Sequence, residues 1–118
     1  MLIDIDHISK GYTKKNILVL GDLILDVYEF GKVDRISQEA PVPIVAIDRK
    51  SHKPGGAANV ALNLSGLGAK VELIGISGDD NNHDELQRCL KFNDNINLHL
   101  VKDKNRPTSV KTRIIADG

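Results

Sequence analysis

The chain has 118 residues and a formal net charge of zero, with sixteen basic and sixteen acidic side chains. Apolar residues make up 41% of the composition and charged residues 27%, which is typical of a folded globular domain. The balanced charge argues against nucleic acid or an anionic membrane surface as a partner. A single cysteine, Cys89, excludes an internal disulfide framework and a cysteine-rich zinc site.

No apolar run approaches the roughly 20 residues that a membrane-spanning helix needs. The segment Met1–Asp6 contains acidic side chains too early for the apolar region of a signal peptide. We therefore expect a cytoplasmic protein. Residues 1–16 are mostly polar and predict a short helix or a loose leader.

The first apolar run, Ile17–Leu20, stops at a Gly-Asp turn signal and predicts a strand buried on both faces, as in a parallel sheet. Residues 23–48 mix apolar and charged side chains, and Pro41 and Pro43 interrupt them. Prolines on both sides of Val42 favour an edge strand or an exposed extended segment. We interpret this stretch as a small β excursion off the main sheet.

A helix is predicted next, because Val60, Leu64 and Leu67 recur at the spacing of one helical stripe. The small side chains of Ala57, Ala58 and Ala61 would permit close packing of this helix. Gly68 fits its C-terminal cap. Strands and one more helix follow: a buried strand at Val71–Ile76, a polar helix at Asp84–Phe92, a half-exposed strand at Ile96–Val101, a turn-rich loop at Lys102–Pro107 and a strand at Ser109–Ala116.

Buried strands that alternate with helices indicate right-handed βαβ units and an α/β fold with a doubly wound parallel sheet. The chain stops directly after an apolar strand, at Asp117-Gly118, with few core strands. A sheet cut there would have an open edge, so we expect a piece of a larger domain.

Two acidic residues follow the first predicted strand. If the chain stays extended, Asp22 and Asp26 point to the same side, at the edge of the sheet where α/β proteins place their ligands. Carboxylates there can accept hydrogen bonds from sugar hydroxyls. Equally, Asp22 could cap a turn and Asp26 could be merely solvated.

A glycine pair stands before the predicted helix. Gly55 and Gly56 would let a ligand approach the backbone, and Asn59 adds a side chain that donates and accepts. The segment matches neither a Walker motif nor a dinucleotide fingerprint. Taken alone, it is better explained as a tight connection that needs small residues for packing.

Basic residues mark the last predicted strand. Lys111 and Arg113 share one face and could hold a phosphate, although alternating charge on an exposed strand explains them more simply. The histidines lack metal-ligand spacing, so we predict no metal site in this chain; they are His7, His52, His83 and His99.

Together these segments resemble the amino-terminal part of a ribokinase-like (PfkB-type) carbohydrate kinase. The resemblance extends from Ile17 to Asp117. Its motifs are Gly21-Asp22 through Asp26, Pro54 through Leu64 with a Gly-Gly-Ala-Ala-Asn core, Gly78-Asp79-Asp80, and Arg106 through Arg113. The segment Arg35–Pro43 is most similar to the bacterial heptose 7-phosphate kinase branch that feeds ADP-heptose synthesis for lipopolysaccharide.

The resemblance implies a sugar-binding pocket. Asp26 is expected to contact sugar hydroxyls. Gly55, Gly56 and Asn59 are expected to close the same pocket. Asp22 carries over less directly, because other branches of the family vary at this position.

The resemblance also implies how the chain is organised. Residues 17–118 would form the amino-terminal portion of the kinase domain, with a β lid made of segments at about residues 27–47 and 96–116. The lid covers the sugar and can form a homodimer interface. Lys111 and Arg113 lie in the returning lid segment, and we assign them to the phosphate of a sugar phosphate.

The implied activity is ATP-dependent phosphorylation of D-glycero-β-D-manno-heptose 7-phosphate at C1, giving the 1,7-bisphosphate. ATP and Mg²⁺ are the implied cofactors of the full-length enzyme. We expect neither on this chain, nor a catalytic residue, because the family's Gly-Ala-Gly-Asp loop and Asn-x-x-Glu element are absent from it.

Phosphoryl transfer depends on positioning and charge stabilisation, so we predict no measurable kinase activity from this chain alone. Two alternatives stay open. One is a non-catalytic module for sugar phosphate binding or dimerisation. The other is a kinase of the same family for another sugar or a nucleoside.

Overall fold

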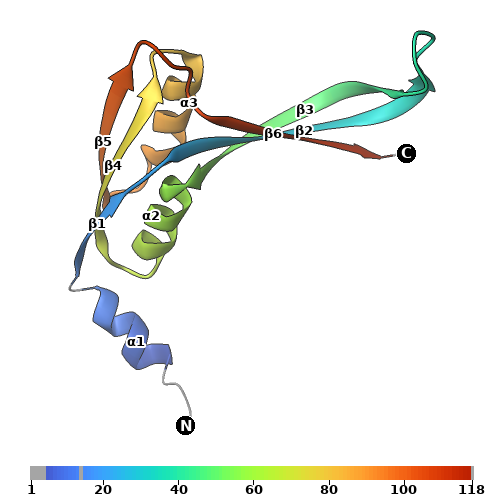
Figure 1. Cartoon of the computed structure of the whole chain (residues 1–118). Coiled ribbons are helices and arrows are strands. Elements are labelled where there is room, and N and C mark those ends of the chain that lie inside the picture. The colour runs from blue at the N-terminus through green and yellow to red at the C-terminus, as the bar shows by residue number, and fades with distance from the viewer. Residues whose placement is uncertain (1–4, 14, 118) are drawn as a thin grey trace.

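The computed structural model describes residues 5–13 and 15–117, which fold into three helices and six strands. Two three-stranded sheets organise them (Figure 1). We call β1-β4-β5 the main sheet. We call β3-β2-β6 the arm sheet, because it extends away from the body of the molecule (Figure 1).

Helix α1 (Ile5–Tyr12) precedes the main sheet, so the expected short helix within residues 1–16 is present. Residues 1–4 and 14 of that range lie outside the described residues. Ile5 is 74% exposed, which shows that α1 adds little to the core. Within the described ranges, no helix has the length and apolar character needed to cross a lipid bilayer.

The main sheet is parallel, with β4 in its centre. The chain passes from β1 to β4 through the arm and α2, and from β4 to β5 through α3. The bounds are β1 (Asn16–Leu20), α2 (Ala57–Gly66), β4 (Lys70–Gly78), α3 (Asn81–Leu90) and β5 (Ile96–Asp103). Because strands and helices alternate as expected, the prediction of an α/β fold with a parallel sheet is confirmed.

Strand β1 is not buried on both faces, and that prediction was wrong. Its side chains alternate, and Leu18 and Leu20 are 62% and 74% exposed. Successive strands are added in one direction, so right-handed crossovers place α2 and α3 on the same face (Figure 1). The other face, toward which Leu18 and Leu20 point, carries no helix among the described residues.

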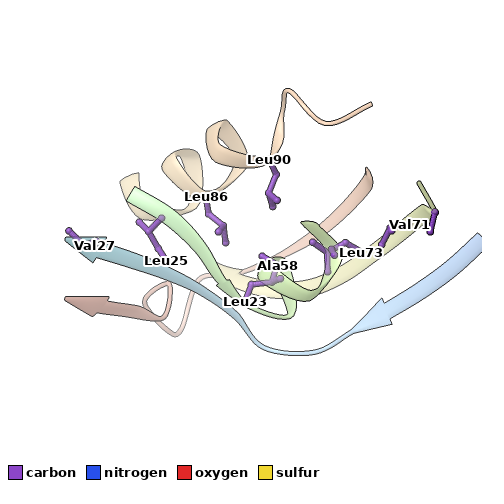
Figure 2. Close-up of a cluster of buried hydrophobic side chains, with 10 residues drawn as sticks. Leu23, Leu25, Val27, Ala58, Val71, Leu73, Leu86 and Leu90 are labelled. Atoms are coloured by element: carbon purple, nitrogen blue, oxygen red, sulfur yellow. The ribbon is translucent and has the colours of Figure 1, made fainter. Parts of the chain in front are cut away.

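The core lies between the helices on one side and the main sheet with the base of the arm on the other (Figure 2). Its largest apolar side chains are Leu23 and Leu25 of β2, Leu73 of β4, and Leu86 and Leu90 of α3. Gly75 of β4 lies against Leu23, where a Cβ atom would collide with the leucine side chain. Leu23 therefore ties the first residues of β2 to the main sheet.

Helix α2 buries a different stripe from the one predicted. Val60 and Leu67 are 49% and 44% exposed, whereas Ala58, Ala61 and Ser65 are buried. The small side chains let the helix backbone approach the sheet closely, whereas Leu64 of the predicted stripe is only partly buried against the core. The close packing expected of Ala58 and Ala61 is confirmed, but the prediction that Val60 and Leu67 belong to the buried stripe was wrong.

The predicted cap at Gly68 is confirmed. Gly68 has a φ of 91°, in the left-handed region that favours glycine. Its N–H donates to the carbonyl of Ser65 at 2.8 Å, and the next N–H, from Ala69, donates to Leu64 at 3.1 Å. These two bonds satisfy carbonyls of the last helical turn.

The arm sheet has β2 in its centre, antiparallel to β3 and parallel to β6. The bounds are β2 (Leu23–Ile36), β3 (Pro43–Gly56) and β6 (Val110–Asp117). The chain turns at the far end of the arm, next to Pro41 and Val42, so the β excursion reaches Gly56 rather than residue 48 (Figure 1). Strand β3 lies at the sheet edge, as its prolines predicted.

The expected lid segment at residues 96–116 was too wide. Residues 96–103 form β5, which pairs with β4 in the main sheet, and only β6 joins the arm sheet. The alternating pattern of this segment fits either location. Leu98 and Leu100 pack against the core, which explains why the segment stays with the main sheet.

Candidate functional site

A groove of about 470 Å³ lies where the arm sheet meets the beginning of α2. It brings together three segments that are distant in the sequence. Its lining residues are Asp26 and Tyr28 of β2, Lys53, Pro54, Gly55 and Gly56 of β3, Asn59 and Leu62 of α2, and Lys111 of β6.

Asp26 lies on the central strand of the arm sheet, with a lysine opposite it on each side. Its register partners are Lys53 on β3 and Lys111 on β6. The Asp26 carboxylate is 2.8 Å from the Lys111 ammonium and 3.4 Å from the Arg113 guanidinium. Its side chain is only 14% exposed, so the two cations balance a carboxylate with limited access to water.

Asp26 does not lie at the end of the first strand of the main sheet, so that prediction was wrong. Strand β1 ends at Leu20, and after Gly21 and Asp22 the chain enters β2, which belongs to the arm sheet. Asp26 therefore owes its position to alternation along β2, where Leu23 and Leu25 face the core.

The glycine pair is required by close contacts on both sides. A Cβ on Gly55 would collide with the Asp26 carboxylate, whose carbon lies 3.1 Å from that position. Gly56 has a φ of 58°, and a Cβ there would collide with the carbonyl of Asp22. Only glycines allow β3 to pass this close to β2 and turn into α2.

Asn59 lies in the first turn of α2, exposed at the mouth of the groove. The helix enters this position because the N–H of Ala57 donates to the carbonyl of Asp22 at 2.9 Å. Asn59 and Asp26 therefore line one groove although they come from different elements.

Two predicted residues are not among the lining set. Asp22 is exposed and contributes its backbone carbonyl to the turn described above. Arg113 contacts the groove through its neighbours, because its guanidinium lies 3.4 Å from Asp26 and 3.1 Å from the Tyr28 hydroxyl. The structure thus unites five of the seven predicted residues in the groove and places Arg113 at its rim.

Sequence reasoning missed Tyr28, Lys53, Pro54 and Leu62. Tyr28 could have been predicted, because it lies two residues after Asp26 and therefore shares the same face of the strand. Lys53 carried a weaker signal, as a basic residue just before the glycine pair. Nothing in the local pattern predicted that Leu62 of α2 would reach the groove.

Two carboxyls and one thiol outside the groove have displaced pKa values. Hydrogen bonds from the Thr108 hydroxyl and backbone lower the pKa of the Asp80 carboxyl. A hydrogen bond from Lys102 lowers the pKa of Asp79. Burial raises the pKa of the Cys89 thiol, so this cysteine is not an activated nucleophile.

The described residues do not fit a magnesium site. Among residues 5–13 and 15–117, no three histidine, cysteine, aspartate or glutamate side chains gather closely enough to hold a metal ion. The groove contributes one carboxylate, Asp26, which is already paired with cations. We therefore derive no step through Mg²⁺ or ATP from this chain.

Comparison with known proteins identifies the family. The profile described as "pfkB family carbohydrate kinase" matches residues 14–118. The chain belongs to this family. The resemblance stated from the sequence motifs is thereby confirmed.

Curated relatives match most of this chain, and one of them is a heptose kinase by name. The "Bifunctional protein HldE" of Coxiella burnetii (strain RSA 331 / Henzerling II) is 47% identical over 107 residues, which is 91% of this chain and 22% of that protein. The "D-beta-D-heptose 7-phosphate kinase" of Bordetella bronchiseptica is 45% identical over 107 residues, 91% of this chain and 34% of that protein. This pfkB chain thus spans 22% to 34% of the length of these two relatives.

Solved pfkB-type structures share the fold. A carbohydrate kinase from Agrobacterium tumefaciens matches with a TM-score of 0.66 at 23% identity, over 86% of this chain and 32% of that one. The fructokinase of Halothermothrix orenii matches with a TM-score of 0.59 at 30% identity, over 84% of this chain and 33% of that one. These matches confirm the expected amino-terminal part of a ribokinase-like fold.

Proposed function

We propose that the groove binds the sugar substrate of a kinase that phosphorylates D-glycero-β-D-manno-heptose 7-phosphate at C1. The observation that carries this proposal is the convergence of Asp26, the glycine pair and Asn59 in one groove. The name of the relative at 45% identity, a D-beta-D-heptose 7-phosphate kinase, supports the heptose substrate.

The chemistry of the lining residues suits a carbohydrate. Asp26 can accept hydrogen bonds from two adjacent hydroxyls, and Asn59 can both donate and accept. Gly55 and Gly56 leave the backbone open to close approach by the ring. We assign Lys111 and Arg113, which flank Asp26, to the phosphate of the substrate.

ATP and Mg²⁺ are the cofactors that this function requires in the full-length enzyme, where they would supply the phosphoryl group and neutralise its charge. The chain described here contributes the sugar side of the site. We therefore expect no measurable turnover from it alone, since positioning without charge stabilisation gives little rate enhancement.

We further propose that the arm sheet is a lid over the groove and a homodimer interface. Apolar side chains stay exposed along it, among them Ile36 at 59% and Ile114 at 59%. Such a surface is typical of a protein contact. Sedimentation of the chain should show a dimer, and Ile114→Asp should shift it to monomer; a wild-type chain that stays monomeric would contradict this part.

Calorimetric titration with D-glycero-D-manno-heptose 7-phosphate tests the main proposal. Asp26→Ala should weaken binding about tenfold or more, because a charged hydrogen-bond partner of the sugar is lost. The matched control is Asp34→Ala, an exposed carboxylate on the same strand outside the groove. Equal affinity of both variants would exclude the groove as the sugar site.

The same titration separates the alternatives. Binding of heptose 7-phosphate to this chain, without ADP release in the presence of ATP, is expected for the sugar side of a kinase site and for a binding module alike. Restoration of turnover by the remaining part of the enzyme favours the kinase. Tighter binding of another sugar phosphate or a nucleoside would shift the substrate assignment.

A further inference from the structure

The groove side of the arm sheet carries more positive charge than its carboxylate can balance. Lys53 and Lys111 lie opposite Asp26, one on each neighbouring strand, and Arg113 lies opposite Tyr28. Three cations therefore face one carboxylate, an excess of two positive charges. Lys50 and Glu29 pair with each other at 2.5 Å and lie opposite one another in the strand register, so they do not reduce this excess.

Tyr28 organises two of these cations. The Lys53 ammonium lies 5.4 Å from the centre of its ring, and the Arg113 guanidinium carbon lies 5.3 Å from it. Arg113 also donates a hydrogen bond to the Tyr28 oxygen at 3.1 Å. The phenol hydrogen is not used in that bond, so the hydroxyl can still donate to an anion.

Lys111 is already committed to another partner. Its ammonium lies 2.8 Å from Asp26, whereas Arg113 lies at the longer distance of 3.4 Å. Lys111 can hold the carboxylate in place while Arg113 and Lys53 turn toward a ligand. Lys53 and Arg113 form no ion pair as short as that of Lys111, and their charged groups lie around the Tyr28 ring.

Resting on the proposed function of the groove, we propose that Tyr28 and Lys53 join Arg113 in binding the phosphate group of the sugar substrate, and that Lys111, assigned to the phosphate above, instead holds the Asp26 carboxylate. Lys53 then sets the preference for a phosphorylated over an unphosphorylated sugar. A phosphate monoester carries a charge of about −1.5 to −2 at pH 7, which matches the excess charge of the groove. Its acceptor oxygens match the N–H and O–H donors of the three side chains.

The test compares the affinity of the chain for D-glycero-D-manno-heptose 7-phosphate with its affinity for D-glycero-D-manno-heptose. Lys53→Met should reduce the ratio of the two affinities about tenfold, and Lys53→Arg should restore most of it. Tyr28→Phe keeps the ring and removes the hydroxyl, so it should reduce the ratio by a smaller factor. Lys50→Met is the matched control, because this lysine pairs with Glu29 and does not line the groove.

A second measurement reports on the phosphate itself. In ³¹P NMR, the second pKa of the bound phosphate should fall below its free value of about 6, because neighbouring cations favour the dianion. Measured on the complex saturated with heptose 7-phosphate, the value for Lys53→Met should lie closer to the free value than the wild-type value does.

The outcomes separate this inference from the proposed function. If the chain binds heptose 7-phosphate and Lys53→Met leaves both the affinity ratio and the phosphate pKa unchanged, the phosphate lies elsewhere and the sugar groove still stands. If the chain binds neither sugar, the proposed function fails as well. A reduced ratio with unchanged affinity for the unphosphorylated heptose supports the phosphate assignment.

Discussion

Thr108 binds Asp80 at two points, joining the loop before β6 to the beginning of α3. The Thr108 hydroxyl donates to one carboxylate oxygen at 2.7 Å, and its backbone N–H donates to the other at 2.9 Å. The next residue, Ser109, accepts a hydrogen bond from Leu25 of β2 at 2.8 Å. This contact fixes where β6 starts, and a slip of one residue would turn Lys111 to the opposite face.

Replacing Thr108 tests this contact. Thr108 is 3% exposed, and its oxygen also accepts from the N–H of Gly78 at 3.0 Å. Thr108→Val should lower the free energy of unfolding by about 1–3 kcal/mol, because buried polar groups lose their partner. Urea denaturation measures this. Ser109→Ala, which removes one surface hydrogen bond to Arg106, should change it by less than about 0.5 kcal/mol.

Acid should weaken the same contact. The pKa of Asp80 is lowered in the folded chain, so its carboxylate stabilises the fold above the unfolded value of about 3.9. This contribution is lost as the pH falls through the lowered pKa. The stability difference between wild type and Asp80→Asn should therefore be constant above about pH 5 and shrink toward pH 2. A difference that widens in acid would contradict the assignment.

Substitution of Gly55 should affect sugar binding, whereas substitution of Gly56 should affect stability. Gly55→Ala should displace the Asp26 carboxylate and weaken heptose 7-phosphate binding, since the added Cβ occupies its place. Gly56→Ala should lower stability by about 1–2 kcal/mol, because its φ is positive. Gly66→Ala meets no atom within 4 Å and should be neutral or stabilising. Thermal unfolding and calorimetric titration of the three variants distinguish these effects.

The buried stripe of α2 can be tested by exchanging neighbours. Ala61→Val adds two methyl groups at a fully buried position and should lower the free energy of unfolding by about 1–3 kcal/mol. Val60→Ala removes a half-exposed side chain and should change it by less than about 0.5 kcal/mol. Denaturant titration of both variants decides the orientation of the helix, and the reverse order of effects would restore the originally predicted stripe.

Local sequence patterns predicted an element correctly where the pattern is compatible with only one structure. Leu86 and Leu90 on a polar helix could only face the core, and Gly68 could only end α2. The exposure of Leu18 was not predictable in this way, because an apolar strand is buried on both faces only if helices cover both. The number of layers is a property of the whole domain, which no window along the chain contains.

The residues of the groove also fall into those that a local motif predicts and those that depend on strand pairing. Asp26, Gly55 and Asn59 were identified from motifs, and the structure brings them together. That Lys53 and Lys111 lie opposite Asp26 depends on the pairing of strands far apart in the sequence, which alternation within one strand does not determine.

The central place of β2 in the arm sheet couples the arm's shape to its charge. If β6 separates, Lys111 and Arg113 leave with it, so Asp26 loses both of the cations with which it pairs. Separation of β6 from β2 and a change in the affinity of the groove for anions should therefore occur together. Added salt, which screens these ion pairs, should consequently also weaken the attachment of β6 to the arm sheet.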